Sequence, residues 1–256
     1  MRLYKAVVAL LAAVVVASCD KNAVQDITGP LESGRIKFFN FGVNAPGVNF
    51  YANTTKMTAI TSASGTEATT GVTYGSVGSG GFYAAIAPGQ YAFAGKIAAT
   101  VDKDLAVATI NGTIADGKSY SLYLSGFYNT TNKSVEGFIV QDDYPATIDF
   151  NVAYVRFVNA ISNANPMTLY AKSTTTATET AIGGTVAYKA GGAFVSIPGG
   201  SYDLSTRYAG SSTNAITRTA VSFSAGRVYT ISARGDITIT STTATNRPFL
   251  DNTANR

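Results

Sequence analysis

The side chains of this chain that could do chemistry are few, because histidine is absent and cysteine occurs once. Without histidine, Ser-His and Cys-His catalytic pairs and histidine-ligated metal sites are excluded within these 256 residues. The remaining candidates are two close pairs of carboxylates, Asp102 with Asp104 and Asp142 with Asp143. Asp102 and Asp104 could begin a calcium site, although the Gly and closing Glu of an EF-hand loop do not follow. Asp142 and Asp143 stand at the expected domain junction, where they could hold calcium between the domains. We expect both pairs to lie in solvated loops, with a calcium-stiffened adhesin module as the alternative.

Other catalytic patterns are weak. The glycine-rich residues 75–81 lack dinucleotide or phosphate-loop spacing and predict a hairpin turn. A glycosidase needs two carboxylates that face each other across the substrate, and no acids stand among clustered aromatic residues here. We therefore predict a protein that is not an enzyme and uses no cofactor, and a carboxylate-dependent glycan-active hydrolase is the alternative.

The single cysteine, Cys19, follows a segment with the parts of a bacterial export signal. Arg2 and Lys5 supply positive charge, and residues 6–17 form an apolar run. As a helix, this run would be about 18 Å long, too short to span a bilayer. Small residues lead into the cysteine as in a lipobox, which implies cleavage after residue 18 and lipidation of Cys19. An ordinary secretory signal with an incidental thiol is the alternative.

Tyrosine gives a different signal, since there are 15 tyrosines and no tryptophan. Tyrosine combines a large apolar face with a hydroxyl group and is enriched at interfaces. Four tyrosines fall near expected strand edges and are candidates for an interface: Tyr83, Tyr123, Tyr128 and Tyr208. The alternative interpretation is that these rings fill half-buried strand positions.

The elements that would position these residues come in two copies. Residues 36–40 and 48–52 return, 119 residues later and without a gap, as residues 155–159 and 167–171. A repeated hairpin predicts a repeated domain. In both copies the alternation of side chains places Lys37 and Arg156 on the face opposite the apolar residues.

Short runs rich in Thr, Val, Tyr and Phe, separated by Gly turns, predict an all-β chain. We expect two tandem antiparallel β-sandwiches, immunoglobulin- or transthyretin-like, with about seven strands each. The expected order is a signal peptide (1–18), a polar tether (19–33), a first sandwich (34–144), a second sandwich (150–240) and a frayed tail (241–256).

Charge is distributed unevenly between the halves. Residues 20–149 carry 8 basic and 11 acidic groups, whereas residues 150–256 carry 9 and 4. A basic second half could meet lipid headgroups or acidic glycan, but the absence of a basic run favours scattered solvated side chains. No basic patch interleaved with aromatic residues indicates nucleic acid.

Several motifs recur at matching places in the two copies. They are the basic position of the first strand (Lys37, Arg156), the loop after it (residues 44–46, 163–164), the second strand (48–51, 167–170) and a Gly-x-Tyr turn (89–91, 200–202). On these motifs both copies resemble the family catalogued as domain of unknown function 4397. The resemblance implies an extracytoplasmic β-sandwich without an established activity.

The chain departs from the pattern of that family at two places. Asn40 and Asn159 stand where the family often has a histidine, and Asn49 and Thr168 replace an aspartate of the second strand. If those family positions bind a metal or a proton, this chain has lost that ability.

Together these features predict a non-enzymatic protein of the bacterial cell envelope, anchored to the membrane by lipid on Cys19. The outer membrane or cell surface is the favoured location, and a periplasmic face is the alternative. We expect the protein to bind a glycan or another protein, or to act as a structural spacer.

Overall fold

A computed structural model describes residues 32–60 and 64–256 of the chain. The expected signal peptide and Cys19 lie outside the described residues. Residues 32–256 form one compact unit. Within the described residues, no helix has the length and apolar character needed to cross a bilayer.

Among the described residues, the first half of this unit contains nine strands and the 3-10 turn η2 (Gly78–Gly81). The strands are β1 (Gly34–Asn40), β2 (Val48–Ala52), β3 (Thr55–Lys56), β4 (Ser76–Val77), β5 (Ala84–Ile86), β6 (Gly89–Ile97), β7 (Ala106–Ile114), β8 (Ser119–Asn129) and β9 (Ser134–Gln141).

The second half also contains nine strands. They are β10 (Val152–Asn159), β11 (Met167–Ser173), β12 (Glu179–Val186), β13 (Ala190–Gly191), β14 (Val195–Pro198), β15 (Gly200–Tyr208), β16 (Ile216–Phe223), β17 (Val228–Arg234) and β18 (Phe249–Ala254). The expectation of about seven strands per half was too low, because short strands such as β3, β4 and β13 leave little trace in the sequence.

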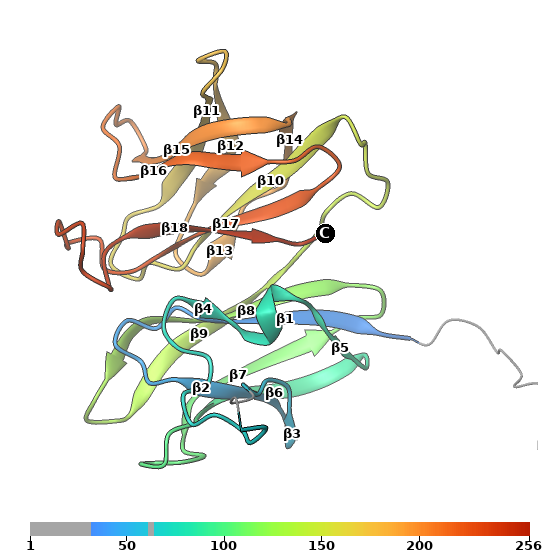
Figure 1. Ribbon diagram of the computed structural model, residues 1–256, viewed down its shortest axis with the longest axis vertical. Helices are drawn as coiled ribbons and strands as arrows, with labels where there is room; N and C mark the ends of the chain where they lie inside the picture. Colours follow the sequence, from blue (N-terminus) through green and yellow to red (C-terminus); the bar gives the residue numbers. More distant parts are fainter. Residues whose placement is uncertain (1–31, 61–63) are drawn as a thin grey trace, which may run out of the picture. The chain divides into compact units, whose positions relative to one another are not determined.

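Each half is a sandwich of two sheets, and the strand order is the same in both (Figure 1). One sheet runs β4-β1-β8-β9, with β5 also paired to β1, and its counterpart runs β13-β10-β17-β18, with β14 paired to β10. The other sheets run β3-β2-β6-β7 and β12-β11-β15-β16. The prediction of an all-β sandwich fold is confirmed.

One pair of strands in each half is parallel, which differs from the expected wholly antiparallel arrangement. β1 pairs with β8, and β10 pairs with β17, in parallel register. Parallel strands are characteristically buried on both faces. This holds here, because one face of these sheets packs inside its own sandwich and the other packs against the opposite sandwich.

Each sandwich has its own apolar core. In the first half, Phe38 of β1 stacks on Phe50 of β2 with ring centroids 5.0 Å apart, and both are buried. In the second half, Phe157 and Leu169 occupy the corresponding places and are fully buried. The alternation of side chains in residues 36–40 and 155–159 therefore identified the core face correctly.

The expected frayed tail at 241–256 is wrong over its last residues. Phe249–Ala254 form β18, which pairs antiparallel with β17 at the edge of the sheet. Leu250 is fully buried in the second core. A composition of Ser, Thr and Asn suggested fraying, but two apolar residues in this segment are enough to dock it.

Candidate functional site at the seam between the two sandwiches

The two sandwiches meet at a contact that we call the seam, formed by β1, β8 and β9 on one side and β10, β17 and β18 on the other. Its centre is apolar. Phe39 stacks on Tyr123 with centroids 4.5 Å apart, and Tyr123 stacks on Phe138 at 5.1 Å. Val158 and Ala160 complete this buried cluster from the second half. The seam is therefore packed in the manner of a protein core.

A buried ion pair crosses the seam beside this cluster. The guanidinium of Arg156 on β10 pairs through Nη2 with Oδ1 of Asp142, and both side chains are almost completely buried. Arg156 Nε donates to Thr230 Oγ1 at 3.0 Å, and Nη1 donates to the Gln141 carbonyl at 2.9 Å. The guanidinium also lies 4.9 Å from the ring centroid of Phe194. All three nitrogens of the guanidinium thus have hydrogen-bond or ion-pair partners within the protein.

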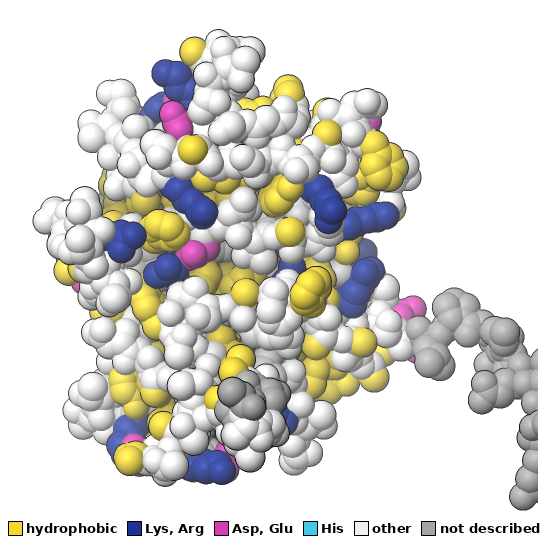
Figure 2. Space-filling view, viewed as in Figure 1, with side chains coloured by type: hydrophobic (Ala, Val, Ile, Leu, Met, Phe, Trp, Pro, Cys, Tyr) yellow, Lys and Arg dark blue, Asp and Glu magenta, His cyan; other side chains and the backbone are white. Residues whose placement is uncertain are grey.

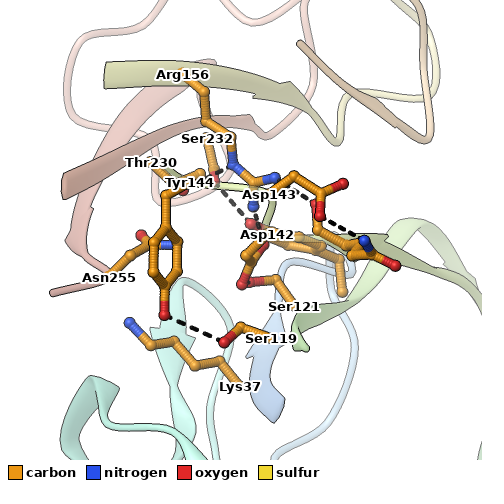
Figure 3. Close-up of polar contacts among 12 residues, drawn as sticks. Lys37, Ser119, Ser121, Asp142, Asp143, Tyr144, Arg156, Thr230, Ser232 and Asn255 are labelled. Atoms are coloured by element: carbon orange, nitrogen blue, oxygen red, sulfur yellow. Dashed lines mark hydrogen bonds and ion pairs between the residues drawn. The ribbon is translucent and has the colours of Figure 1, made fainter. Parts of the chain in front are cut away.

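The carboxylate of Asp142 is equally engaged. Its Oδ2 accepts hydrogen bonds from Tyr83 Oη at 2.6 Å and from Ser121 Oγ at 2.8 Å. Figure 3 shows Asp142 with Ser121 and Arg156 beside it. Burial and the nearby Asp142 carboxylate raise the pKa of Tyr83, so Tyr83 stays neutral and donates its proton. A buried charge requires this degree of hydrogen bonding, because desolvation otherwise outweighs the attraction between the ions.

Lys37 on β1 is a second buried cation in the seam, with a relative exposure of 2%. Its Nζ donates to the carbonyl of Ala254 and lies 4.3 Å from the ring centroid of Tyr83. Burial lowers the pKa of Lys37 to about 8, although the negative charge of Asp142 opposes that shift.

The surroundings of Lys37 and Arg156 are related by a pseudo-two-fold arrangement. Each cation stands over an aromatic ring of its own half and donates to a carbonyl at the end of the other half's last strand, Ala254 for Lys37 and Gln141 for Arg156. On the facing strands, Tyr123 and Ser232 occupy equivalent positions, and their hydroxyls lie 3.2 Å apart. The seam therefore brings the same face of each copy together.

The pseudo-symmetry is broken at one informative position. The backbone N–H of Asp142 donates to the Ser119 carbonyl at 2.7 Å. The backbone N–H of Asn255 donates to the Val228 carbonyl at the same distance. Asn255 thus occupies in the second half the position that Asp142 occupies in the first, and its side chain carries an amide in place of a carboxylate. Arg156 consequently has an acidic partner across the seam, whereas the partner position for Lys37 is neutral.

Two cavities open at this end of the seam. One, of about 390 Å³, is lined by Lys37, Tyr83, Asn255 and neighbouring residues. The other, of about 610 Å³, is lined by Asp142, Tyr144 and Asn255 among others. Volumes of a few hundred Å³ are typical of small-molecule sites. The network can therefore present cations and amides to a small polar ligand.

One of the four candidate carboxylates is placed differently from what we expected, and the other three are exposed outside the strands. Asp142 is not solvated, because it forms the buried ion pair with Arg156, whereas Asp143 is exposed and accepts a hydrogen bond from Gln141. Asp102 forms an exposed ion pair with Lys133 at 2.6 Å. Asp104, two residues on, lies 3.5 Å from the hydroxyl of Tyr51. Within residues 32–60 and 64–256, no group of three or more acidic, His or Cys side chains is placed to hold a metal ion.

The candidate interface tyrosines divide into two groups. Tyr83 and Tyr123 lie in the seam between the halves, and burial raises the pKa of Tyr123 to about 12. Tyr128 and Tyr208 are partly buried and pack against the first and second cores. Tyr128 and Tyr208 thus occupy half-buried strand positions, whereas Tyr123 is fully buried in its strand and Tyr83 lies in the loop before β5.

Sequence reasoning did not identify Lys37 and Arg156 as buried site residues. Their charge suggested a solvent-facing side of the strand. A signal was present, because large apolar residues share that side: Phe39 lies two residues after Lys37, and Val158 two residues after Arg156. An apolar face that carries one cation at the same place in both copies indicates a buried contact rather than a solvated surface.

Comparison with known proteins finds one family model that matches the second half. The family model described as "Domain of unknown function (DUF4397)" matches residues 153–256. A search of curated proteins gave no match.

The solved structure titled "The Bacillus anthracis TIE protein" is similar to this chain. The similarity covers 79% of this chain and 34% of the chain in that structure, with 15% identity and a TM-score of 0.24. This chain thus spans about a third of that structure, and a TM-score this low does not establish a common fold. The residues matched by the model of the DUF4397 family cover strands β10 to β18 almost completely, with Arg156 at the basic position of the first strand.

Proposed function

We propose that this chain is a non-enzymatic, lipid-anchored protein of the bacterial cell envelope whose two sandwiches act as one binding module. The observation that carries the proposal is the seam, where a buried aromatic cluster and a hydrogen-bonded ion pair join the halves. A seam packed in this way holds loops of both halves in fixed positions relative to one another and creates the cavities at its end.

The first sandwich is proposed to be a second domain of the same family. The strand order of β1 to β9 repeats that of β10 to β18, and Lys37 stands at the position of Arg156. The family match itself covers residues 153–256.

The binding role is preferred to hydrolysis because of how the candidate carboxylates are used. Asp142 is held by Arg156, Tyr83 and Ser121, and Asp102 is held by Lys133. A general acid or nucleophile must instead be free to reach the substrate. Turnover of a polysaccharide that is lost on substitution of one Asp or Glu would contradict this part of the proposal.

The anchor is tested by growing bacteria that express the wild-type chain or Cys19→Ala with an alkyne-tagged palmitate. Lipid should label the wild-type protein and not the variant, since the proposed acylation requires the sulfur of Cys19. Protease treatment of intact and lysed cells then reports exposure. Digestion in intact cells supports a surface-displayed module, protection supports a periplasmic one, and an unlabelled wild-type protein would reject the anchor.

A further inference from the structure

Lys37 is a buried cation that lacks a carboxylate partner. Among residues 32–60 and 64–256, Lys37 takes part in none of the ion pairs, whereas its counterpart Arg156 is paired with Asp142. A neutral amide, Asn255, occupies the position from which a carboxylate would reach it. Since burying an unpaired ammonium is costly, the site favours an anion that approaches Lys37 from outside.

The cavity beside Lys37 carries further groups suited to an anion. Arg227 and Arg256 line it, and both are exposed. Neither belongs to an ion pair within the part of the chain that the structure describes. Figure 2 shows Lys and Arg side chains gathered at this end of the seam, around the place where the chain ends in Figure 1. Exposed cations next to a buried one would attract a carboxylate and guide it inward.

The same cavity offers an acceptor for a hydroxyl group. Asn255 lines it, and its Oδ1 atom is buried without a hydrogen-bond partner among the described residues. Asn255 as a whole is 8% exposed. Buried polar atoms are almost always hydrogen-bonded in folded proteins, so an unpaired oxygen beside a cavity indicates a ligand that carries a donor.

An aromatic ring stands at the edge of this cavity. Phe82 is 77% exposed and lines it, directly before Tyr83. A large exposed ring at a polar cavity is unusual for a residue that only serves folding, and it offers a flat apolar surface to a ligand ring.

We propose that the cavity lined by Lys37, Phe82 and Asn255 binds a uronic acid unit of an acidic saccharide. The sugar carboxylate meets the cations, one of its hydroxyls donates to the free Oδ1 atom of Asn255, and the face of its ring lies on Phe82. A cavity of about 390 Å³ has the size for one or two sugar rings. A peptide of Asp and Glu residues would satisfy the cations but brings no sugar hydroxyl to the amide oxygen of Asn255.

This inference rests on the proposed binding role, and it is tested on the purified full-length protein by calorimetric titration. The probes are trigalacturonate, a neutral galactose trisaccharide and triglutamate. Trigalacturonate should bind, and the other two should bind at least about tenfold more weakly, the scale of one charge-assisted hydrogen bond. Equal binding of triglutamate would overturn the assignment to a saccharide, and absence of binding by trigalacturonate would overturn the site.

Two exposed residues of the cavity locate the binding without disturbing the seam. Arg227→Gln should weaken trigalacturonate about tenfold, and Phe82→Ala should also weaken it, because each removes a different part of the ligand contact. Lys103→Gln makes the same charge change on an exposed lysine away from the cavity and should bind as the wild type does. If all three variants bind equally well, the ligand lies elsewhere and the proposed cavity is wrong.

The two proposals fail in distinguishable ways. If palmitate does not label the wild-type protein, the proposed lipid anchor is wrong, and the calorimetric result is unaffected. Failure of trigalacturonate to bind, with labelling intact, contradicts the ligand assignment and leaves the envelope module in place.

Discussion

Asp142 shows how one residue can hold two sandwiches together without contributing a large net stability. A buried ion pair gains little over an apolar pair of the same shape, because both charges lose their hydration. Removing one member is a different matter, since the other charge then stays buried without a partner. Arg156 would be that charge here.

Asp142→Asn should therefore lower the free energy of unfolding by about 3 kcal/mol. The amide keeps the shape of the side chain but leaves the guanidinium of Arg156 without its counter-charge. Urea unfolding followed by circular dichroism measures the loss. Asp143→Asn is the matched control, because its carboxylate is exposed and makes only a local hydrogen bond to Gln141. Equal stability of the two variants would contradict the role given to the ion pair.

Lys37 predicts an unusual dependence of stability on alkaline pH. Its pKa is lowered from 10.5 to about 8 in the folded protein by burial, among Asp142, Arg156 and Tyr83. Between these values the unfolded chain holds a proton that the folded chain has lost, so stability rises with pH. Above about pH 10 the trend reverses, because the pKa values of Tyr83 and Tyr123 are raised in the folded state and unfolded tyrosines ionise first.

The rise between pH 8 and pH 10 should be on the order of 2 kcal/mol. Urea unfolding at intervals of half a pH unit would measure it. Lys37→Met keeps a long apolar side chain and has no proton to lose, so its profile should be flat over that range. A wild-type profile that matches the variant would show that Lys37 titrates normally.

At the scale of the elements, the two sheets that form the seam are the unusual feature, because their strands β1, β8, β10 and β17 are buried on both faces. Tight contacts follow from this. Gly191 of β13 leaves no room for a side chain, since an added Cβ would lie 2.8 Å from Val140 Cγ1 on β9 of the other half. Gly184 on β12 has no neighbour within 4 Å of the corresponding point.

Gly191→Ala should therefore loosen the seam and cost about 1 to 3 kcal/mol of stability, the usual penalty for overpacking. Gly184→Ala has the same composition change and should be neutral or slightly stabilising, because alanine lowers the entropy of the unfolded chain. Thermal melts of both variants would compare them. A harmless Gly191→Ala would mean that the halves can separate at little cost.

Much of this element structure could be predicted from the sequence, for identifiable physical reasons. Side-chain alternation in residues 36–40 gives the core face, because a strand has a period of two. The parallel pairing of β1 with β8 could not be predicted, since partners about 85 residues apart leave no local pattern. The buried seam was hidden because Lys37 and Arg156 carry charges, and charge normally marks the solvent side.

At the scale of the molecule, the two sandwiches share a buried contact and should unfold together. The apolar cluster of Phe39, Tyr123 and Phe138 would be exposed if either half unfolded alone. Differential scanning calorimetry should therefore give a single transition, with the calorimetric enthalpy equal to the van't Hoff enthalpy. Two resolved transitions would show that the halves are independent, and the candidate cavities at the seam would then lose their fixed geometry.

The position of β1 also has a mechanical consequence. A chain held by lipid at its N-terminal end, as proposed, would receive any pull from the membrane at Gly34, where β1 begins. This strand lies in the interior of its sheet, with β8 on one side and β4 and β5 on the other. A force directed along it loads the hydrogen bonds of the ladder together, in shear, rather than opening them one after another as at a sheet edge. The protein should therefore resist traction from its anchor better than heat or urea measurements alone would suggest.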